Sequence, residues 1–93
     1  MQLEISEYAK YEIDDAVEYY NLQEDKLGDI FKMDVKNCID RILISPNLYP
    51  NIVENIKRSL LHRFPYSIFY AIESEKIIIL SVAHQSRKPF YWV

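Results

Sequence analysis

Apolar positions in the first part of the chain repeat with the period of an α-helix. Four residues spaced by four, three and four positions share one helical face: Ala9, Ile13, Ala16 and Tyr20. The acidic residues that occupy most of the other side are expected to be solvated: Glu12, Asp14, Asp15 and Glu18. Ser6 is suited to cap the N-terminus of this helix, and Glu7 complements the helix dipole in the first turn. We therefore predict a helix over residues 6–22.

A second amphipathic pattern follows after a short connection. Its apolar positions are spaced by four, four, three and four: Leu27, Phe31, Val35, Cys38 and Ile42. Pro46 bounds the pattern, because proline lacks a backbone donor and disfavours a helical residue before it. Two amphipathic helices joined by a short connection form an antiparallel hairpin. Residues 46–51, which contain two prolines, are predicted to be a loop.

The second half of the chain changes to the pattern of β-strands. Residues 66–72 and 77–83 are rich in aromatic and β-branched side chains, and residues 73–76 form a polar turn of hairpin length. A weaker strand is predicted over residues 56–63, ending near Pro65, and residues 2–5 are suited to an edge strand. The order is β-α-α-β-β-β. We predict a single α+β domain over residues 1–93, in which a small antiparallel sheet packs one face on the helical hairpin.

Composition restricts the class of protein further. Apolar residues make up 49% of the chain and charged residues 27%, which is typical of a globular domain. The single cysteine, Cys38, excludes an internal disulfide and a cysteine-based zinc site, and its place on an apolar helical face predicts a buried, inert thiol. The start of the chain lacks the pattern of a signal peptide, and the apolar runs are too short to span a bilayer. We expect a cytoplasmic protein with no membrane partner.

The formal charge of −3 is distributed unevenly. Residues 1–53 carry a net charge of −6, whereas residues 54–93 carry +3. The second half is therefore able to present a positive face to an anionic partner, although the whole chain is acidic.

Candidate chemistry gathers in the same half. His84 ends a predicted strand that leads into a basic segment containing Arg87, and Tyr91 follows in an aromatic tail. Arg58 precedes His62 by four positions on the predicted strand, so both are expected on one side and Arg63 on the other. A patch of Arg58, His84 and Arg87 is one interpretation; a solvated face with ion pairs to the acidic helices is the alternative.

The sequence contains no pattern of a cofactor or metal site. The sole glycine, Gly28, excludes a glycine-rich phosphate loop, and two histidines without regular carboxylate spacing do not indicate a metal. We expect neither a cofactor nor a bound metal. Most of the eight tyrosines are expected to pack, those of the first helix beside its buried stripe: Tyr8, Tyr11, Tyr19 and Tyr20.

Two segments together resemble the RelE/ParE toxin family. They are residues 63–70, RFPYSIFY, and residues 77–92, which end in HQSRKPFYW. Residues 18–20, 27–31 and 45–50 stand where that family has similar segments, so the resemblance covers nearly the whole chain. It agrees with the predicted β-α-α-β-β-β order.

This resemblance implies the toxin of a bacterial type II toxin–antitoxin module, silenced by a cognate antitoxin. RelE-like members cut messenger RNA on the ribosome without a metal, whereas ParE-like members poison DNA gyrase and cut nothing themselves. In the nuclease branch a 2′-hydroxyl attacks the adjacent phosphate, basic side chains stabilise the charge, and a Tyr, His or Glu moves protons.

Site residues carry over only in part. Arg87 and Tyr91 match the basic and tyrosine positions near the nuclease C-terminus, and His84 offers an acid/base group. Lys57 and Arg58 partly represent the basic pair of an earlier strand, but Ser67 stands where RelE has an arginine. These departures and the acidic charge favour a ParE-like gyrase inhibitor. The alternatives are a ribosome-dependent mRNA endoribonuclease using Arg58, His84, Arg87 and Tyr91, and a degenerate member that only binds an antitoxin.

Overall fold

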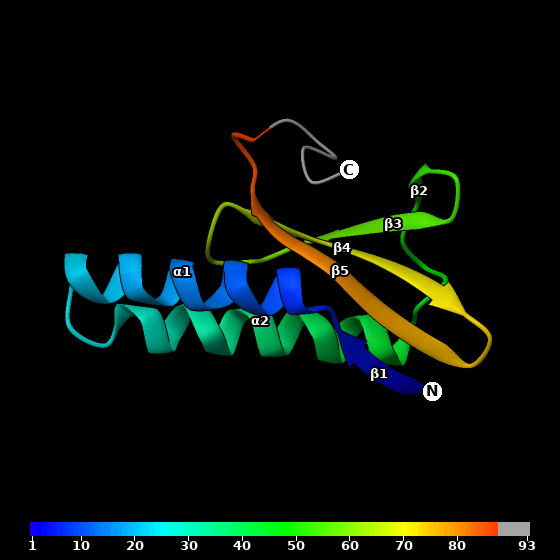
Figure 1. The fold of residues 1–93 in the computed structure, drawn as a ribbon, viewed down its shortest axis with the longest axis horizontal. Helices are drawn as coiled ribbons and strands as arrows, with labels where there is room; N and C mark the ends of the chain where they lie inside the picture. Colours follow the sequence, from blue (N-terminus) through cyan, green and yellow to red (C-terminus); the bar gives the residue numbers. More distant parts are fainter. Residues whose placement is uncertain (88–93) are drawn as a thin grey trace.

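The computed structural model describes residues 1–87 and shows an α+β fold of two helices and a five-stranded sheet (Figure 1). The elements in chain order are β1 (Gln2–Ile5), α1 (Glu7–Gln23), α2 (Leu27–Ile44), β2 (Asn51–Val53), β3 (Ile56–Leu60), β4 (Tyr66–Glu73) and β5 (Lys76–His84). The strand order across the sheet is β1-β5-β4-β3-β2. The helical hairpin lies on one side of this sheet, as predicted.

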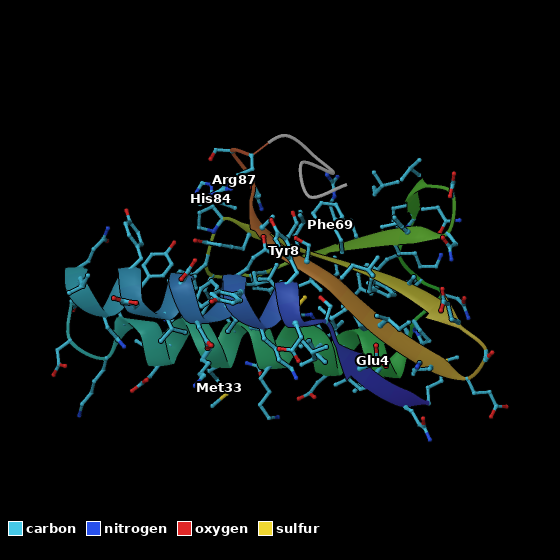
Figure 2. All side chains as sticks on the ribbon, in the orientation of Figure 1. Glu4, Tyr8, Met33, Phe69, His84 and Arg87 are labelled. Carbon is cyan, nitrogen blue, oxygen red and sulfur yellow. The ribbon has the colours of Figure 1, made fainter. Side chains whose placement is uncertain are left out.

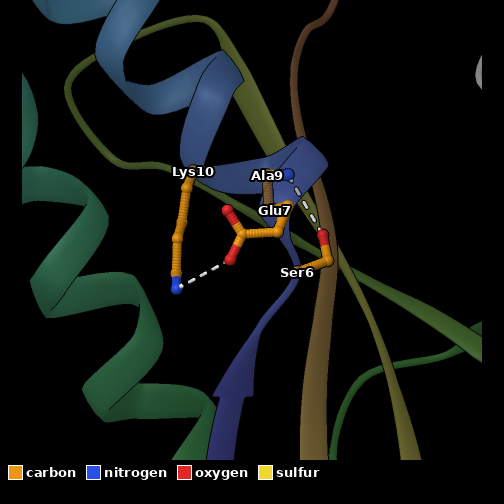
Figure 3. A network of polar contacts seen from close by, with 4 residues as sticks. All are labelled: Ser6, Glu7, Ala9 and Lys10. Carbon is orange, nitrogen blue, oxygen red and sulfur yellow. Dashed lines mark hydrogen bonds and ion pairs between the residues drawn. The ribbon is translucent and has the colours of Figure 1, made fainter.

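Both helices lie close to their predicted bounds. The Ser6 side chain accepts a hydrogen bond from the Ala9 backbone N–H at 3.0 Å, which confirms the predicted cap, and Lys10 pairs with Glu7 in the next turn (Figure 3). At the crossing of the helices, Gly28 donates its backbone N–H to Asn21 Oδ1 at 2.7 Å. A Cβ atom at residue 28 would clash with the Val17 carbonyl and the Asn21 side chain, so this crossing requires glycine.

The core lies between the hairpin and the sheet. Its fully buried aromatic and aliphatic side chains include Phe31, Ile42, Ile68, Tyr70 and Ile77. β5 contains a β-bulge. Phe69 pairs with Ser81 but Tyr70 pairs with Ile79, so Leu80 is an extra residue. The bulge changes which positions of β5 face the helices, because the alternation shifts by one residue. Ile77 and Ile79 before it and Val82 after it therefore all join one core.

Three details of the predicted sheet were wrong. Residues 51–53, predicted as part of a loop or left unassigned, form β2 and pair with β3. The strand predicted over residues 56–63 ends at Leu60. The sheet is not wholly antiparallel, because β1 runs parallel to β5. The element order is thus β-α-α-β-β-β-β, with one more strand than predicted.

The surface of α1 also differs from the prediction. Tyr20 packs against the core, but Tyr8, Tyr11 and Tyr19 are 42%, 73% and 55% exposed. Glu12, predicted to be solvated, instead accepts hydrogen bonds from the Val82 backbone N–H and the Ser81 hydroxyl. Neither described helix is long and apolar enough to cross a membrane.

Candidate functional site

Three of the four predicted site residues line one shallow groove of about 310 Å³. Arg58 comes from β3. His84 comes from the end of β5 and Arg87 from the turn that follows (Figure 2). Tyr91 lies outside the described residues. The remaining lining comes from β3, β4, β5 and the same turn: Leu60, Ser67, Phe69, Ala83 and Gln85.

Strand register explains why these residues meet. Arg58 lies opposite Phe69 across β3 and β4, while Ser67 lies opposite Ala83 across β4 and β5. Side chains at these positions point to the face of the sheet away from the helices, because their neighbours Ile68 and Val82 belong to the core. The groove is therefore built on the face of the sheet that the hairpin does not cover.

The turn after β5 is held by backbone hydrogen bonds. The Gln85 N–H donates to the Pro65 carbonyl at 2.8 Å, and the Arg87 N–H donates to the His84 carbonyl at 3.0 Å. The Ser86 N–H donates to Nδ1 of His84 at 3.0 Å. Nδ1 is thereby occupied as an acceptor, which leaves Nε2 as the ring nitrogen available to a ligand.

The ring of Tyr66 forms a T-shaped pair with the His84 imidazole, with centroids 5.1 Å apart. Burial, together with a smaller effect of the neighbouring Tyr20, raises the pKa of Tyr66 to about 12. A tyrosine with so high a pKa stays protonated near neutral pH and cannot act there as a general base. With Nδ1 accepting from Ser86, the neutral His84 ring carries its proton on Nε2, which makes that nitrogen a hydrogen-bond donor to a ligand.

A second groove, of about 470 Å³, lies between α1 and the end of β5. His84 and Arg87 line it too, so these two side chains stand between both grooves. On the helix side it is lined by residues spaced three, four and four positions apart: Tyr8, Tyr11, Asp15 and Tyr19. The spacing of this stripe can be read in the sequence beside the buried stripe, but the prediction that these tyrosines pack is wrong, because all three are exposed.

The other residues that the sequence analysis singled out lie outside the groove that contains His84. His62 and Arg63 are exposed and follow the end of β3. His62 nevertheless lines a groove together with Arg58, as predicted, although strand alternation does not extend to it. Cys38 is buried, as predicted, with Sγ 3.4 Å from the Ser59 hydroxyl, and burial raises the pKa of its thiol. Within residues 1–87, no cluster of His, Cys, Asp and Glu side chains is suited to hold a metal ion.

Comparisons with known proteins give a consistent result. The family model of the ParE toxin of the type II toxin–antitoxin system parDE matches residues 3–89. Among solved structures, a chain of the chromosomal ParDE TA system from P. aeruginosa is similar, with a TM-score of 0.81 and 18% sequence identity over 90% of this chain and 95% of that one. At this identity the likeness shows a shared fold. Among curated proteins, no sequence match was found.

Proposed function

Because this chain belongs to the ParE toxin family of type II toxin–antitoxin systems, we propose that it arrests bacterial growth by binding DNA gyrase. The family implies a cognate antitoxin as the partner that keeps the toxin silent. On this proposal the chain inhibits its target by protein–protein contact and catalyses no reaction itself.

The position of Ser67 is the observation that favours this target. Ser67 lines the groove with Arg58 and Arg87, at the position where the resemblance to RelE implies an arginine. Its side chain is buried and its neighbours in the groove include Leu60 and Phe69, which supply no charge. A phosphate undergoing attack needs several cations preorganised around it, and here one of those places holds a hydroxyl. The net charge of −3 also gives little attraction to ribosomal RNA.

A ribosome-dependent endoribonuclease is the second candidate. It is supported by the convergence of Arg58, His84 and Arg87 on one groove. In that mechanism the arginines would stabilise the phosphorane charge, and His84 would move a proton together with Tyr91. A chain that only binds an antitoxin is the third alternative, and failure to arrest growth in the absence of that antitoxin would favour it.

Two assays on the purified chain separate the first two candidates. In a supercoiling assay with purified gyrase, we expect the wild-type chain to inhibit the enzyme. In primer extension on a defined messenger RNA with purified ribosomes, we expect no new ends. Ends at A-site codons would contradict the gyrase target and assign the nuclease.

Variants sharpen the second assay. If the nuclease were correct, Arg87→Ala would abolish both the new ends and growth arrest, because it removes a cation from the groove. Arg63→Ala is the matched control, since this exposed arginine lies outside the groove and its structural contact uses the backbone N–H. On the gyrase proposal, an Arg87→Ala, Tyr91→Phe double variant whose fold is unchanged still produces no ends and still requires gyrase for its toxicity.

A further inference from the structure

The outward side of α1 beside the end of β5 carries exposed aromatic side chains. Tyr11 and Tyr19 are 73% and 55% exposed, and Asp15 lies between them on the same helical side, four positions from each. These three residues, here called the α1 face, line the groove of about 470 Å³. Tyrosines gathered beside a groove are typical of protein–protein contact surfaces, because the ring supplies apolar area while the hydroxyl stays hydrated.

The charge of α1 indicates the kind of partner. The helix contains five acidic residues and one lysine, and that lysine, Lys10, already pairs with Glu7. Asp15 is exposed and forms no hydrogen bond or ion pair with any described residue. A carboxylate between two aromatic rings suits a Lys or Arg side chain, which pairs with the carboxylate and lies against the rings. The same charge repels the phosphates of a nucleic acid.

The opposite wall of the groove has a different charge. His84 and Arg87 line it there, at the end of β5 and in the turn that follows (Figure 2). The Arg87 guanidinium repels an incoming cation and so directs it toward α1. A groove with a carboxylate on one wall and a cation on the other fixes the orientation in which a partner docks.

The backbone at this edge of β5 is already engaged. The Ser6 hydroxyl donates to the Leu80 carbonyl at 3.1 Å, and Glu12 accepts from the Val82 N–H at 2.8 Å. A peptide that binds as an additional strand needs such backbone groups to be unoccupied. The groove is therefore suited to side chains that project from a folded surface more than to an extended segment.

We propose that the α1 face contacts a Lys- or Arg-bearing surface of gyrase, with one cation paired to Asp15 and lying against the rings of Tyr11 and Tyr19. The inference rests on the proposed function, because gyrase is the partner that it names. An enzyme that handles DNA presents Lys and Arg to the phosphates, so it offers a charge complementary to that of this face.

Inhibition of supercoiling by the purified chain tests the role of Asp15. We expect Asp15→Lys to raise the concentration for half-inhibition about tenfold or more, because it brings like charges together, and Asp15→Glu to stay within about threefold of the wild type. Asp14→Lys is the matched control, since it makes the same charge change at the preceding exposed position of α1, outside the groove. It should shift the concentration less than about threefold.

The aromatic ring of Tyr11 is tested in the same assay. Tyr11→Ala should weaken inhibition about fivefold or more, whereas Tyr11→Phe should keep most of it, because the cation contacts the ring and not the hydroxyl. The melting temperature of Tyr11→Ala should stay near that of the wild type, because the side chain is exposed. Loss of affinity for the antitoxin with unchanged inhibition of gyrase would assign the α1 face to the antitoxin and overturn the proposal.

A photo-crosslinking residue placed at Tyr11 identifies the occupant. With purified gyrase, we expect it to capture a gyrase peptide that contains Lys or Arg, with less capture by the chain that also carries Asp15→Lys. Wild-type inhibition by both Asp15→Lys and Tyr11→Ala, or capture of a peptide without Lys or Arg, would overturn the proposal and leave gyrase as the target. A wild-type chain that does not inhibit gyrase would instead contradict the target itself, so the two failures are distinguishable.

Discussion

The two helices are joined to the sheet by contacts of different kinds. On the α2 side, the Asp34 carboxylate is only 3% exposed and accepts from the backbone N–H groups of Arg63 and Phe64 at 2.8 and 3.2 Å. On the α1 side, Glu12 accepts from the Val82 N–H at 2.8 Å and the Ser81 hydroxyl at 2.7 Å in a partly buried setting. Both carboxylates reach from a helix to backbone donors, but one holds a loop and the other a strand edge.

The place of β1 explains this difference. β1 pairs with β5 only as far as Ile5 and Ile79, so the outer edge of β5 beyond that point has no strand neighbour. Beyond that point, α1 and its N-cap residue bond to the edge. The Ser6 hydroxyl donates to the Leu80 carbonyl, and Glu12 accepts from the Val82 N–H. Side chains rather than a further strand satisfy this edge, and the groove lined by tyrosines lies beside it, between α1 and the end of β5. α2 instead packs on the face of the sheet, and the carboxylate of its Asp34 is buried.

The largest predicted effect is on the α2 side. Asp34→Ala should lower the free energy of unfolding by about 2–4 kcal/mol, because it leaves two N–H groups without their acceptor in a buried place. Urea denaturation measures this loss. Asp34→Asn, which keeps one carbonyl oxygen, is the control and should lose less. A loss below about 1 kcal/mol for Asp34→Ala would show that water replaces the carboxylate.

A smaller effect is expected on the α1 side. Glu12→Ala should cost about 1–2 kcal/mol, because the Glu12 carboxylate is only half-buried, unlike that of Asp34, and water can replace part of the lost contact. Asp15→Ala, an exposed carboxylate on the same helix, is the control. A double-mutant cycle with Ser81→Ala isolates the side-chain bond. If Glu12→Ala costs as much as Asp34→Ala, the different burial of the two carboxylates does not affect their contributions to the free energy of unfolding.

The third and smallest effect is expected at high pH, through the ionisation of one tyrosine on each side of the fold. Burial raises the pKa of both Tyr66 and Tyr70 to about 12, from the ordinary tyrosine value of 10.0. Because the folded state holds these protons more tightly, their contribution is complete below about pH 10 and is lost as the pH rises toward about 12. Tyr66→Phe and Tyr70→Phe should therefore each flatten the fall of the melting temperature over this range.

Tyr11→Phe is the control for that series, since Tyr11 is 73% exposed. At neutral pH Tyr70→Phe should also lower the melting temperature, because the Tyr70 hydroxyl donates to the Pro46 carbonyl at 2.7 Å and its loss leaves that carbonyl without this donor. Equal pH dependence in the wild type and both variants would mean that other groups control unfolding in base.

The sequence was most informative where structure is local. Helix periodicity and the Ser6 cap gave both helices to within a few residues. β2 was missed because it has only three residues, between Pro50 and a turn in which Glu54 has a positive φ of 47°. β3 was predicted too long because the amides of Arg63 and Phe64 bond to Asp34, a residue 29 and 30 positions away, and not to a strand.

The candidate sites also depend on contacts between residues that are far apart in the sequence. Residue types pointed to Arg58, His84 and Arg87, but only the register of β3, β4 and β5 brings them to one groove. Glu12 could not be told from its solvated neighbours, because the N–H that it binds lies 70 positions away.

The parallel pairing of β1 with β5 has a consequence for synthesis in the cell. Ser6 bonds to a carbonyl 74 positions further along the chain, and β1 has no partner until that stretch has been made. The helical hairpin, whose contacts are local, can form early, but its apolar stripe stays exposed until the sheet has been made. A nascent or prematurely terminated chain therefore lacks the strand that joins both ends of the fold. Translation that stops before residue 76 should yield only substrates for chaperones and proteases, so a toxin built in this way acquires its activity all at once.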